Sequence, residues 1–273
     1  MAWYGPHGQQ TYYEDTGRGD PVVLLPGWGG SITELNHLRR ELVHGFRVIA
    51  ADLPGSGRSQ PQPRQYRASY YTDDARTLLG LLDALRVEAA HLVGFSDGGE
   101  DALLMAALRP RCALSVVTWG AAGQVAASPG MLDALARLVD DPVDPLKVLA
   151  AYLVEAYGVG QARVMAASWA QALRGIVEAG GDISRARADL ITCPALLITG
   201  AYDPFCPPGL VREMADAIPR GEYLEAPNAG HDVHQSSPRW SAGTSGARVG
   251  ERVGVVTRPM LPQTGPSREP ADG

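Results

Sequence analysis

Residues 91–99 read HLVGFSDGG, a short apolar run that leads into the pattern G-x-S-x-G. Residues of helical character follow from Glu100 to Leu108. A strand, a sharp turn and a helix in this order lift the serine, Ser96, over the end of a sheet. Small residues are needed beside it, because such a turn is strained and the helix packs close to the strand. The same glycines also suit a plain turn, so the pattern alone leaves both interpretations open.

Apolar segments and helical segments alternate along the chain. The segments expected to form strands are 11–14, 21–25, 47–51, 91–93, 114–119, 195–199 and 222–225, and the helical patterns between them include 33–43, 71–85 and 100–108. This alternation is typical of βαβ units. It predicts the α/β class, with a mostly parallel central sheet and helices on both faces. Sites in such sheets lie beyond the carboxyl ends of the strands, where Ser96 is expected.

One long segment, 123–188, breaks the alternation. It is helical in character over 131–139, 146–157 and 163–177 and contains no convincing strand. We interpret it as a helical cap over the site, inserted into a core formed by residues 1–122 and 189–240. Residues 241–273 contain prolines and glycines with little helical periodicity, and we interpret them as an atypical, disordered tail.

The composition excludes several classes of protein. The chain has 273 residues, 45% of them apolar, and a net charge of -6, which argues against nucleic acid or an anionic membrane as a partner. No apolar run approaches the ~20 residues that span a bilayer, and the N-terminus does not resemble a signal peptide. The three cysteines are far apart and indicate neither a disulfide framework nor a zinc site. A cytoplasmic location is therefore expected, while the oligomeric state stays open.

Two further residues complete a candidate catalytic group with Ser96. A serine hydroxyl becomes a good nucleophile when a histidine takes its proton and a carboxylate orients that histidine. In sheets of this type the chain order is serine, acid, histidine. Asp203 follows the predicted strand 195–199, and His231 follows the predicted strand 222–225. Taken singly, Asp203 could be a turn residue and His231 a surface loop residue, but together with Ser96 they predict a triad.

Neighbouring residues suggest the remaining parts of the site. His234 competes with His231 but falls inside the helix expected next, so we prefer His231. The backbone N–H of Asp97 and that of Trp28, in the glycine-containing loop 26–30, are the candidate donors to an oxyanion. Alternatively, this loop is only a flexible turn.

Two other patterns lead to no site. Residues 52–59 begin like a nucleotide-binding fingerprint, but Gln60 stands where the third glycine belongs. His231 and His234 lack a matching group of carboxylate and histidine ligands for a metal. We therefore expect neither a cofactor nor a metal.

Taken together, these segments resemble the α/β-hydrolase superfamily. Within it the chain is most similar to the valacyclovir hydrolase, or biphenyl hydrolase-like, group, on the motifs at 26–27, 96–99 and 119–121. The resemblance implies that a small carboxylic ester is hydrolysed through an acyl-enzyme, with α-amino acid esters among the candidate substrates. In that group the acid beside the nucleophile helps to hold the substrate's ammonium, which implies this substrate-binding role for the Asp97 side chain. The alternative is that Asp97 only forms hydrogen bonds within the turn.

Two rival functions remain. The same triad could cleave a carbon–carbon bond or a thioester, which the cap would decide. An inactive hydrolase fold could also serve as a binding protein. The chain departs from the family after Trp240, where relatives continue into a long amphipathic helix. A shifted reading frame in the gene would produce a tail of the composition seen at 241–273. This departure favours the inactive protein, whereas Ser96, Asp203 and His231 favour the enzyme.

Overall fold

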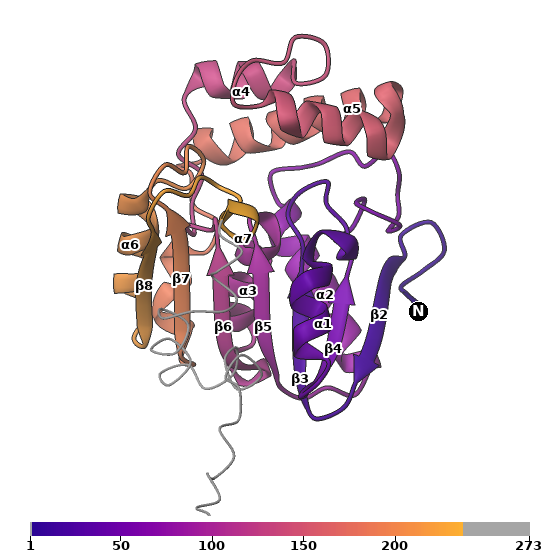
Figure 1. Cartoon of the computed structure of the whole chain (residues 1–273), viewed down its shortest axis with the longest axis vertical. Helices are drawn as coiled ribbons and strands as arrows, with labels where there is room; N and C mark the ends of the chain where they lie inside the picture. Colours follow the sequence, from indigo (N-terminus) through magenta and orange to yellow (C-terminus); the bar gives the residue numbers. More distant parts are fainter. Residues whose placement is uncertain (1, 237–273) are drawn as a thin grey trace, which may run out of the picture.

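A computed structural model of the chain describes residues 2–236. The predicted tail 241–273 and the last residues of the predicted core, 237–240, lie outside the described residues. The strands form one sheet in the order β1-β2-β4-β3-β5-β6-β7-β8 (Figure 1). They are β1 (Ala2–Tyr4), β2 (Thr11–Gly17), β3 (Asp20–Leu25), β4 (Phe46–Ala51), β5 (Ala90–Phe95), β6 (Ala113–Trp119), β7 (Ala195–Gly200) and β8 (Gly221–Ala226).

The pairing of the strands confirms the predicted α/β class. Strands β3 to β8 run parallel to one another, whereas β2 pairs antiparallel with both β4 and the edge strand β1. Each predicted strand is present, with its ends moved by up to three residues. The three-residue β1 was not predicted, because it is short and none of its residues is fully buried.

Helices occupy the connections between the parallel strands. They are α1 (Asn36–Leu42), α2 (Tyr70–Ala84), α3 (Asp97–Leu108), α4 (Pro129–Ala136), α5 (Lys147–Glu178), α6 (Pro208–Ala217) and α7 (Val233–Ser236). The described residues also form the 3-10 helices η1 (Ile32–Leu35), η2 (Pro110–Cys112) and η3 (Arg185–Leu190). The helix expected over 33–43 therefore starts as the 3-10 turn η1 before it becomes α1. No helix in residues 2–236 is both long and apolar enough to cross a bilayer.

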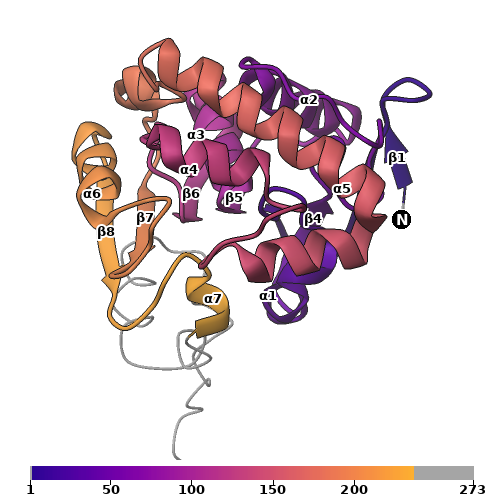
Figure 2. The same ribbon diagram turned by 90° about the horizontal axis from the view of Figure 1, so that it is seen from above.

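The two faces of the sheet support separate apolar clusters, because successive side chains of a strand point to opposite faces. Val23 and Leu25 of β3 belong to the cluster that includes the buried side of α2 and α3. Val22 and Leu24 belong to the other cluster, with Leu42 of α1. Figure 2 shows α2 and α3 on one side of the sheet and α1 and α7 on the other. This two-sided burial explains why the central strands read as continuous apolar runs.

The segment predicted as a cap lies above the carboxyl ends of the parallel strands. Helices α4 and α5 both occupy this position (Figure 1). The two long helical patterns predicted for this segment form the two halves of α5, which is interrupted at Gly158, where φ is 74°. Such a backbone conformation suits glycine, because it has no Cβ to clash. The division of the chain into core and cap domains stays a prediction, although the position of these helices over the strand ends favours it.

Candidate functional site

Ser96 stands at the junction of β5 and α3 with an unusual backbone conformation. Its φ is 52° and its ψ is −119°, outside the regions that non-glycine residues normally adopt. A side chain at Gly94 would collide with the Gly98 carbonyl, and one at Gly98 would collide with the Pro26 carbonyl. The glycines in this motif are therefore required by close packing of strand, turn and helix.

His231 lies between Ser96 and Asp203 and forms a hydrogen bond with each. Its Nε2 is 2.9 Å from Ser96 Oγ, and its Nδ1 is 2.9 Å from Asp203 Oδ2. The three residues follow the ends of β5, β7 and β8, which meet at the same edge of the sheet. The structure therefore brings together the three residues predicted from the sequence.

The other oxygen of Asp203 fixes its carboxylate. The backbone N–H groups of Phe205 and Cys206 both donate to Asp203 Oδ1, each at 2.9 Å. Asp203 is buried, with 4% of its surface exposed. An ionised carboxylate accepts but does not donate, so it favours the histidine tautomer with its proton on Nδ1. That tautomer leaves Nε2 of His231 free to accept the Ser96 proton.

The two predicted oxyanion donors also lie near Ser96. Asp97 begins α3, so its N–H has no partner within the helix. Trp28 is in the loop after β3, and Gly27 beside it packs so closely that a Cβ there would lie 3.4 Å from Ser96 Cβ. Among the hydrogen bonds of residues 2–236, none uses the N–H of Asp97 or of Trp28 as donor. Both N–H groups are therefore unpaired within the described residues, which is what the predicted role requires.

His234, the competing histidine, has a different partner. Its Nδ1 accepts a hydrogen bond from the Trp119 indole at 3.0 Å. Burial lowers the pKa of His234 to about 4, so this imidazole stays neutral at physiological pH. His234 therefore accepts from Trp119, and the histidine that accepts the hydrogen bond of the Ser96 hydroxyl is His231.

The Asp97 carboxylate is held by two tyrosines of α2. Tyr70 donates to Oδ2 at 3.0 Å and Tyr71 donates to Oδ1 at 2.8 Å. Trp169 of α5 donates in turn to the Tyr70 hydroxyl at 2.9 Å. Burial raises the pKa of Asp97 to about 6 despite these hydrogen bonds. Sequence reasoning missed both tyrosines, because the pair reads only as the start of an amphipathic helix.

A second carboxylate, that of Glu34, supports the loop that carries Trp28. Glu34 Oε2 accepts the N–H of Gly27 at 3.1 Å, and a side chain at Gly30 would collide with the same oxygen. Burial raises the pKa of Glu34 to about 7, and His231 is among the charges that oppose this rise. Glu34 therefore lies close to the catalytic candidates. Its position in the sequence did not indicate this proximity.

A third carboxylate, that of Glu100, fixes the loop that follows β6. Its Oε1 accepts the N–H groups of Ala122 and Gly123, each at 2.8 Å. Burial raises the pKa of Glu100 to about 7. Glu100 connects α3, the helix that begins beside Ser96, to the chain that leads into the cap segment.

The motif at 52–59, which we rejected as a nucleotide site, is organised around Asp52. The N–H of Ile32 donates to Oδ1 at 2.6 Å, and the N–H of Arg58 donates to Oδ2 at 2.8 Å. A side chain at Gly57 would collide with this carboxylate. Gly57 therefore makes room for Asp52, and Gly55 makes room for the side chain of Arg64.

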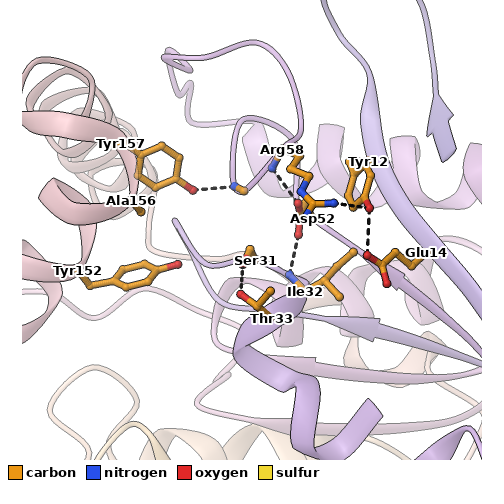
Figure 3. A pocket seen from close by; sticks show the side chains of 11 residues that line it. Tyr12, Glu14, Ser31, Ile32, Thr33, Asp52, Arg58, Tyr152, Ala156 and Tyr157 are labelled. Carbon is orange, nitrogen blue, oxygen red and sulfur yellow. Dashed lines mark hydrogen bonds between the residues drawn. The ribbon is translucent and has the colours of Figure 1, made fainter. Parts of the chain in front are cut away.

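A pocket of about 230 Å³ lies between α5 and the core (Figure 3). Tyr152 and Tyr157 of α5 face the segment 31–33 and Arg58 across it. The Tyr157 hydroxyl accepts the N–H of Gly57 at 2.6 Å. None of Ser96, Asp203 and His231 is among the residues that line this pocket, so it is distinct from the serine–histidine–aspartate group.

One group of side chains in residues 2–236 has the donor atoms of a metal site. It consists of Asp203, Cys206 and His231, whose ligand atoms lie within 4.8 Å of one another. This group was not predicted from the sequence, because the spacing between Cys206 and His231 matches no metal-binding motif.

Comparisons with known proteins agree with this architecture. A model of the alpha/beta hydrolase family matches residues 22–244. The chain is 32% identical to the serine hydrolase BPHL of Homo sapiens, over 84% of this chain and 79% of that protein. It is 31% identical to a pimeloyl-[acyl-carrier protein] methyl ester esterase of Chromobacterium violaceum, over 81% of this chain and 90% of that protein.

A solved structure shares the fold. The enol-lactonase from Burkholderia xenovorans LB400 superposes with a TM-score of 0.70 at 23% identity, over 88% of this chain and 96% of that one. The family model covers most of the chain, and the two relatives described above are named as a hydrolase and an esterase. The chain is therefore an enzyme of the α/β hydrolase family.

Proposed function

We propose that this enzyme is a serine hydrolase that cleaves small carboxylic esters through an acyl-enzyme on Ser96. The observation that carries the proposal is the continuous hydrogen-bonded path from Ser96 through His231 to Asp203. In residues 2–236, no other serine has a histidine on its hydroxyl that is itself bonded to a carboxylate. His91, for example, contacts Ser115, but this pair is buried within the sheet.

The proposed mechanism has two halves. His231 Nε2 takes the Ser96 proton as Oγ attacks the ester carbonyl, and the imidazolium returns that proton to the leaving alcohol. Water then attacks the acyl-enzyme in the same way and releases the acid. Asp203 stabilises the imidazolium in both halves and keeps its own charge.

The N–H groups of Asp97 and Trp28 donate hydrogen bonds to the negative charge that develops on the substrate carbonyl oxygen. Donors that are fixed before the reaction stabilise the tetrahedral intermediate without reorganising. One such donor lowers the activation free energy by about 3 kcal/mol. The hydrogen bond from Gly27 to Glu34 and the close contact of Gly27 with Ser96 support this placement of the Trp28 N–H.

Among esters, those of α-amino acids are the candidate substrates. The Asp97 carboxylate lies beside Ser96 in the chain, and two tyrosines hold it in place. It is ionised above its pKa of about 6, so at neutral pH it carries a charge opposite to that of an ammonium group. In this role Asp97 serves twice, through its N–H for the oxyanion and through its carboxylate for the amine.

Labelling with a fluorophosphonate probe tests the nucleophile directly. The wild-type enzyme is expected to be labelled at Ser96, whereas Ser96→Ala is expected to be unlabelled and to lose several orders of magnitude in kcat on an aryl ester. The exposed Ser69→Ala provides a matched control that keeps both properties. A Ser96→Ala enzyme with more than about a tenth of the wild-type rate contradicts the assignment.

A substrate panel then separates the rival functions. Matched aminoacyl esters, simple acyl esters, thioesters and a carbon–carbon substrate are compared by kcat/KM with the same enzyme. The proposal requires oxygen esters to be the preferred class. Preference for a thioester or a carbon–carbon bond assigns the same triad to another reaction, and a folded protein without probe labelling or turnover identifies a binding protein.

A further inference from the structure

Cys206 is folded back against the carboxylate of Asp203. Its backbone N–H donates to Asp203 Oδ1 at 2.9 Å, as part of the turn that follows β7. Its thiol Sγ donates to the carbonyl oxygen of Gly120 at 3.1 Å. The thiol is thus fixed in place near the end of β6.

Gly120 also contacts the catalytic imidazole. Its φ is 66°, and a Cβ there would lie 2.7 Å from His231 Cε1. The imidazole edge that includes Nδ1 and Cε1 therefore packs on the same glycine whose carbonyl accepts the Cys206 thiol. This shared contact explains how three residues from two loops bring their donor atoms together.

The three donor atoms differ in type and are close to one another. The ring nitrogen of His231 that faces Asp203 is Nδ1, which is 2.9 Å from Oδ2. A ring nitrogen of His231, a carboxylate oxygen of Asp203 and Cys206 Sγ all lie within 4.8 Å of each other. Zinc binds nitrogen, oxygen and sulfur ligands tetrahedrally at ~2.0–2.3 Å, which sets its ligands somewhat closer together than this. A shift of the side chains by about an ångström brings them to zinc-binding distances, with a water as the fourth ligand.

We propose that His231, Asp203 and Cys206 form an inhibitory site for zinc or a similar thiophilic divalent cation. The charges balance: the Cys206 thiolate and the Asp203 carboxylate neutralise the two positive charges of the cation. The thiol proton goes to solvent. Calcium and magnesium prefer sites made of oxygen ligands, so they are not expected to bind here.

Metal binding at Nδ1 removes the catalytic base. The cation takes the nitrogen lone pair of His231 at Nδ1, so the proton of the neutral imidazole moves to Nε2. With a proton on Nε2, His231 cannot accept the proton of Ser96. Burial raises the pKa of the Cys206 thiol well above its usual value, so the cation has to displace the thiol proton.

Inhibition of ester hydrolysis rests on the proposed function, and cadmium absorption provides a readout that does not. Zinc is titrated against aryl-ester hydrolysis by the wild type and by Cys206→Val, each relative to its own metal-free rate. The wild type is expected to be inhibited reversibly, with recovery on addition of a chelator, and not by magnesium. Loss of a ligand is expected to raise the zinc concentration needed at least about tenfold. Cys193→Ala is the matched control and keeps the wild-type sensitivity.

Cadmium is then titrated while the ultraviolet absorption of a cadmium–thiolate bond is recorded. This absorption is expected in the wild type and in Ser96→Ala, and it is expected to be reduced in Cys206→Val. If Cys206→Val does not fold, Cys206→Ser replaces it in both measurements. Equal zinc inhibition of the wild type and the Cys206 variant overturns the proposal, as does equal cadmium absorption. Cys206-dependent cadmium binding by an enzyme without esterase activity supports the metal site and rejects the proposed function.

Discussion

The Tyr157 hydroxyl donates a hydrogen bond to the carbonyl oxygen of Gly29, with 2.7 Å between the two oxygens. Tyr157 is on α5, and Gly29 follows Trp28 in the loop that we propose to supply one oxyanion donor. Leu153, one turn earlier on α5, packs so closely that a Cβ at Gly29 would lie 2.6 Å from its Cδ2. The first half of α5 therefore packs against the loop that is expected to stabilise the reaction intermediate.

Tyr157→Phe is expected to weaken this contact. The substitution removes two hydrogen bonds, those to Gly29 and from Gly57, and each is worth ~1 kcal/mol. We expect a lower free energy of unfolding and a reduced kcat on an aryl ester, measured by urea unfolding and steady-state kinetics. Tyr152→Phe is the control, because Tyr152 lines the same pocket and is 39% exposed. If both variants behave like the wild type, Tyr157 does not position the loop.

Glu34→Gln is expected to change the pH profile of the enzyme. Burial raises the pKa of Glu34 to about 7, so this carboxyl ionises within the assay range. The ionised form is the stronger acceptor for the Gly27 N–H and holds the loop more firmly. The kcat/KM of the wild type should therefore rise through pH 7 more steeply than that of Glu34→Gln. Profiles from pH 5 to 9 that overlay, after scaling, would mean that Glu34 has only a structural role.

Asp97→Asn tests whether the carboxylate holds an ammonium group. The loss of one charge-assisted contact costs roughly 1.5–3 kcal/mol, or about ten- to more than a hundredfold in kcat/KM. The loss should be confined to α-amino esters, and the des-amino analogue of the same ester is the control substrate. Equal losses on the two substrates would show that Asp97 serves only to support Ser96 through Tyr70 and Tyr71.

Asp101→Asn is expected to alter how stability depends on pH. Both carboxyl oxygens of Asp101 are buried without a hydrogen-bond partner among the described residues. Burial and the nearby Asp74 and Asp97 raise its pKa well above the usual value. The folded state therefore binds a proton that the unfolded state has released above about pH 4. Its contribution to stability is complete below that pH and is lost as the pH rises.

The measurement is the free energy of unfolding in urea at pH 5 and at pH 8. One such group changes this free energy by at most ~1.4 kcal/mol per pH unit, and the wild type should lose more stability between the two pH values than Asp101→Asn. The exposed Asp140→Asn is the control for the loss of a carboxylate. An unchanged difference between pH 5 and pH 8 in Asp101→Asn would show that Asp101 is ionised in the folded enzyme.

The sequence predicted those features that depend on local patterns. Apolar runs located the parallel strands, and the motif around Ser96 placed the serine at a strand end. The order of Asp203 and His231 then followed from the ends of two later strands. The 3-10 start of the first helix was missed, because a helical apolar pattern does not distinguish a 3-10 turn from an α-helical one.

Contacts between distant segments could not be predicted in this way. Tyr71 and Asp97 are 26 residues apart, and the Trp169 indole reaches Tyr70 from 99 residues away. Neither spacing corresponds to a periodic pattern or to a known motif. Glu34 and Cys206 were missed for the same reason. An acid in a short helix and a cysteine in a turn belong to no motif, and only the fold brings them close to the candidate catalytic residues.

The hydrogen bond from Trp169 to Tyr70 has a consequence for how this enzyme can diversify. Through Tyr70, the second half of α5 is connected to the residue that adjoins the nucleophile. Substitutions near Trp169 are therefore expected to disturb the support of Ser96, so few of them are neutral. The first half of α5, on the other side of Gly158, contacts Gly29 through Leu153 and Tyr157, whereas Tyr152 and Ala156 are exposed and line the pocket. The shape of that pocket is therefore expected to change more readily in evolution through substitutions at Tyr152 and Ala156 than at Leu153, Tyr157 or Trp169.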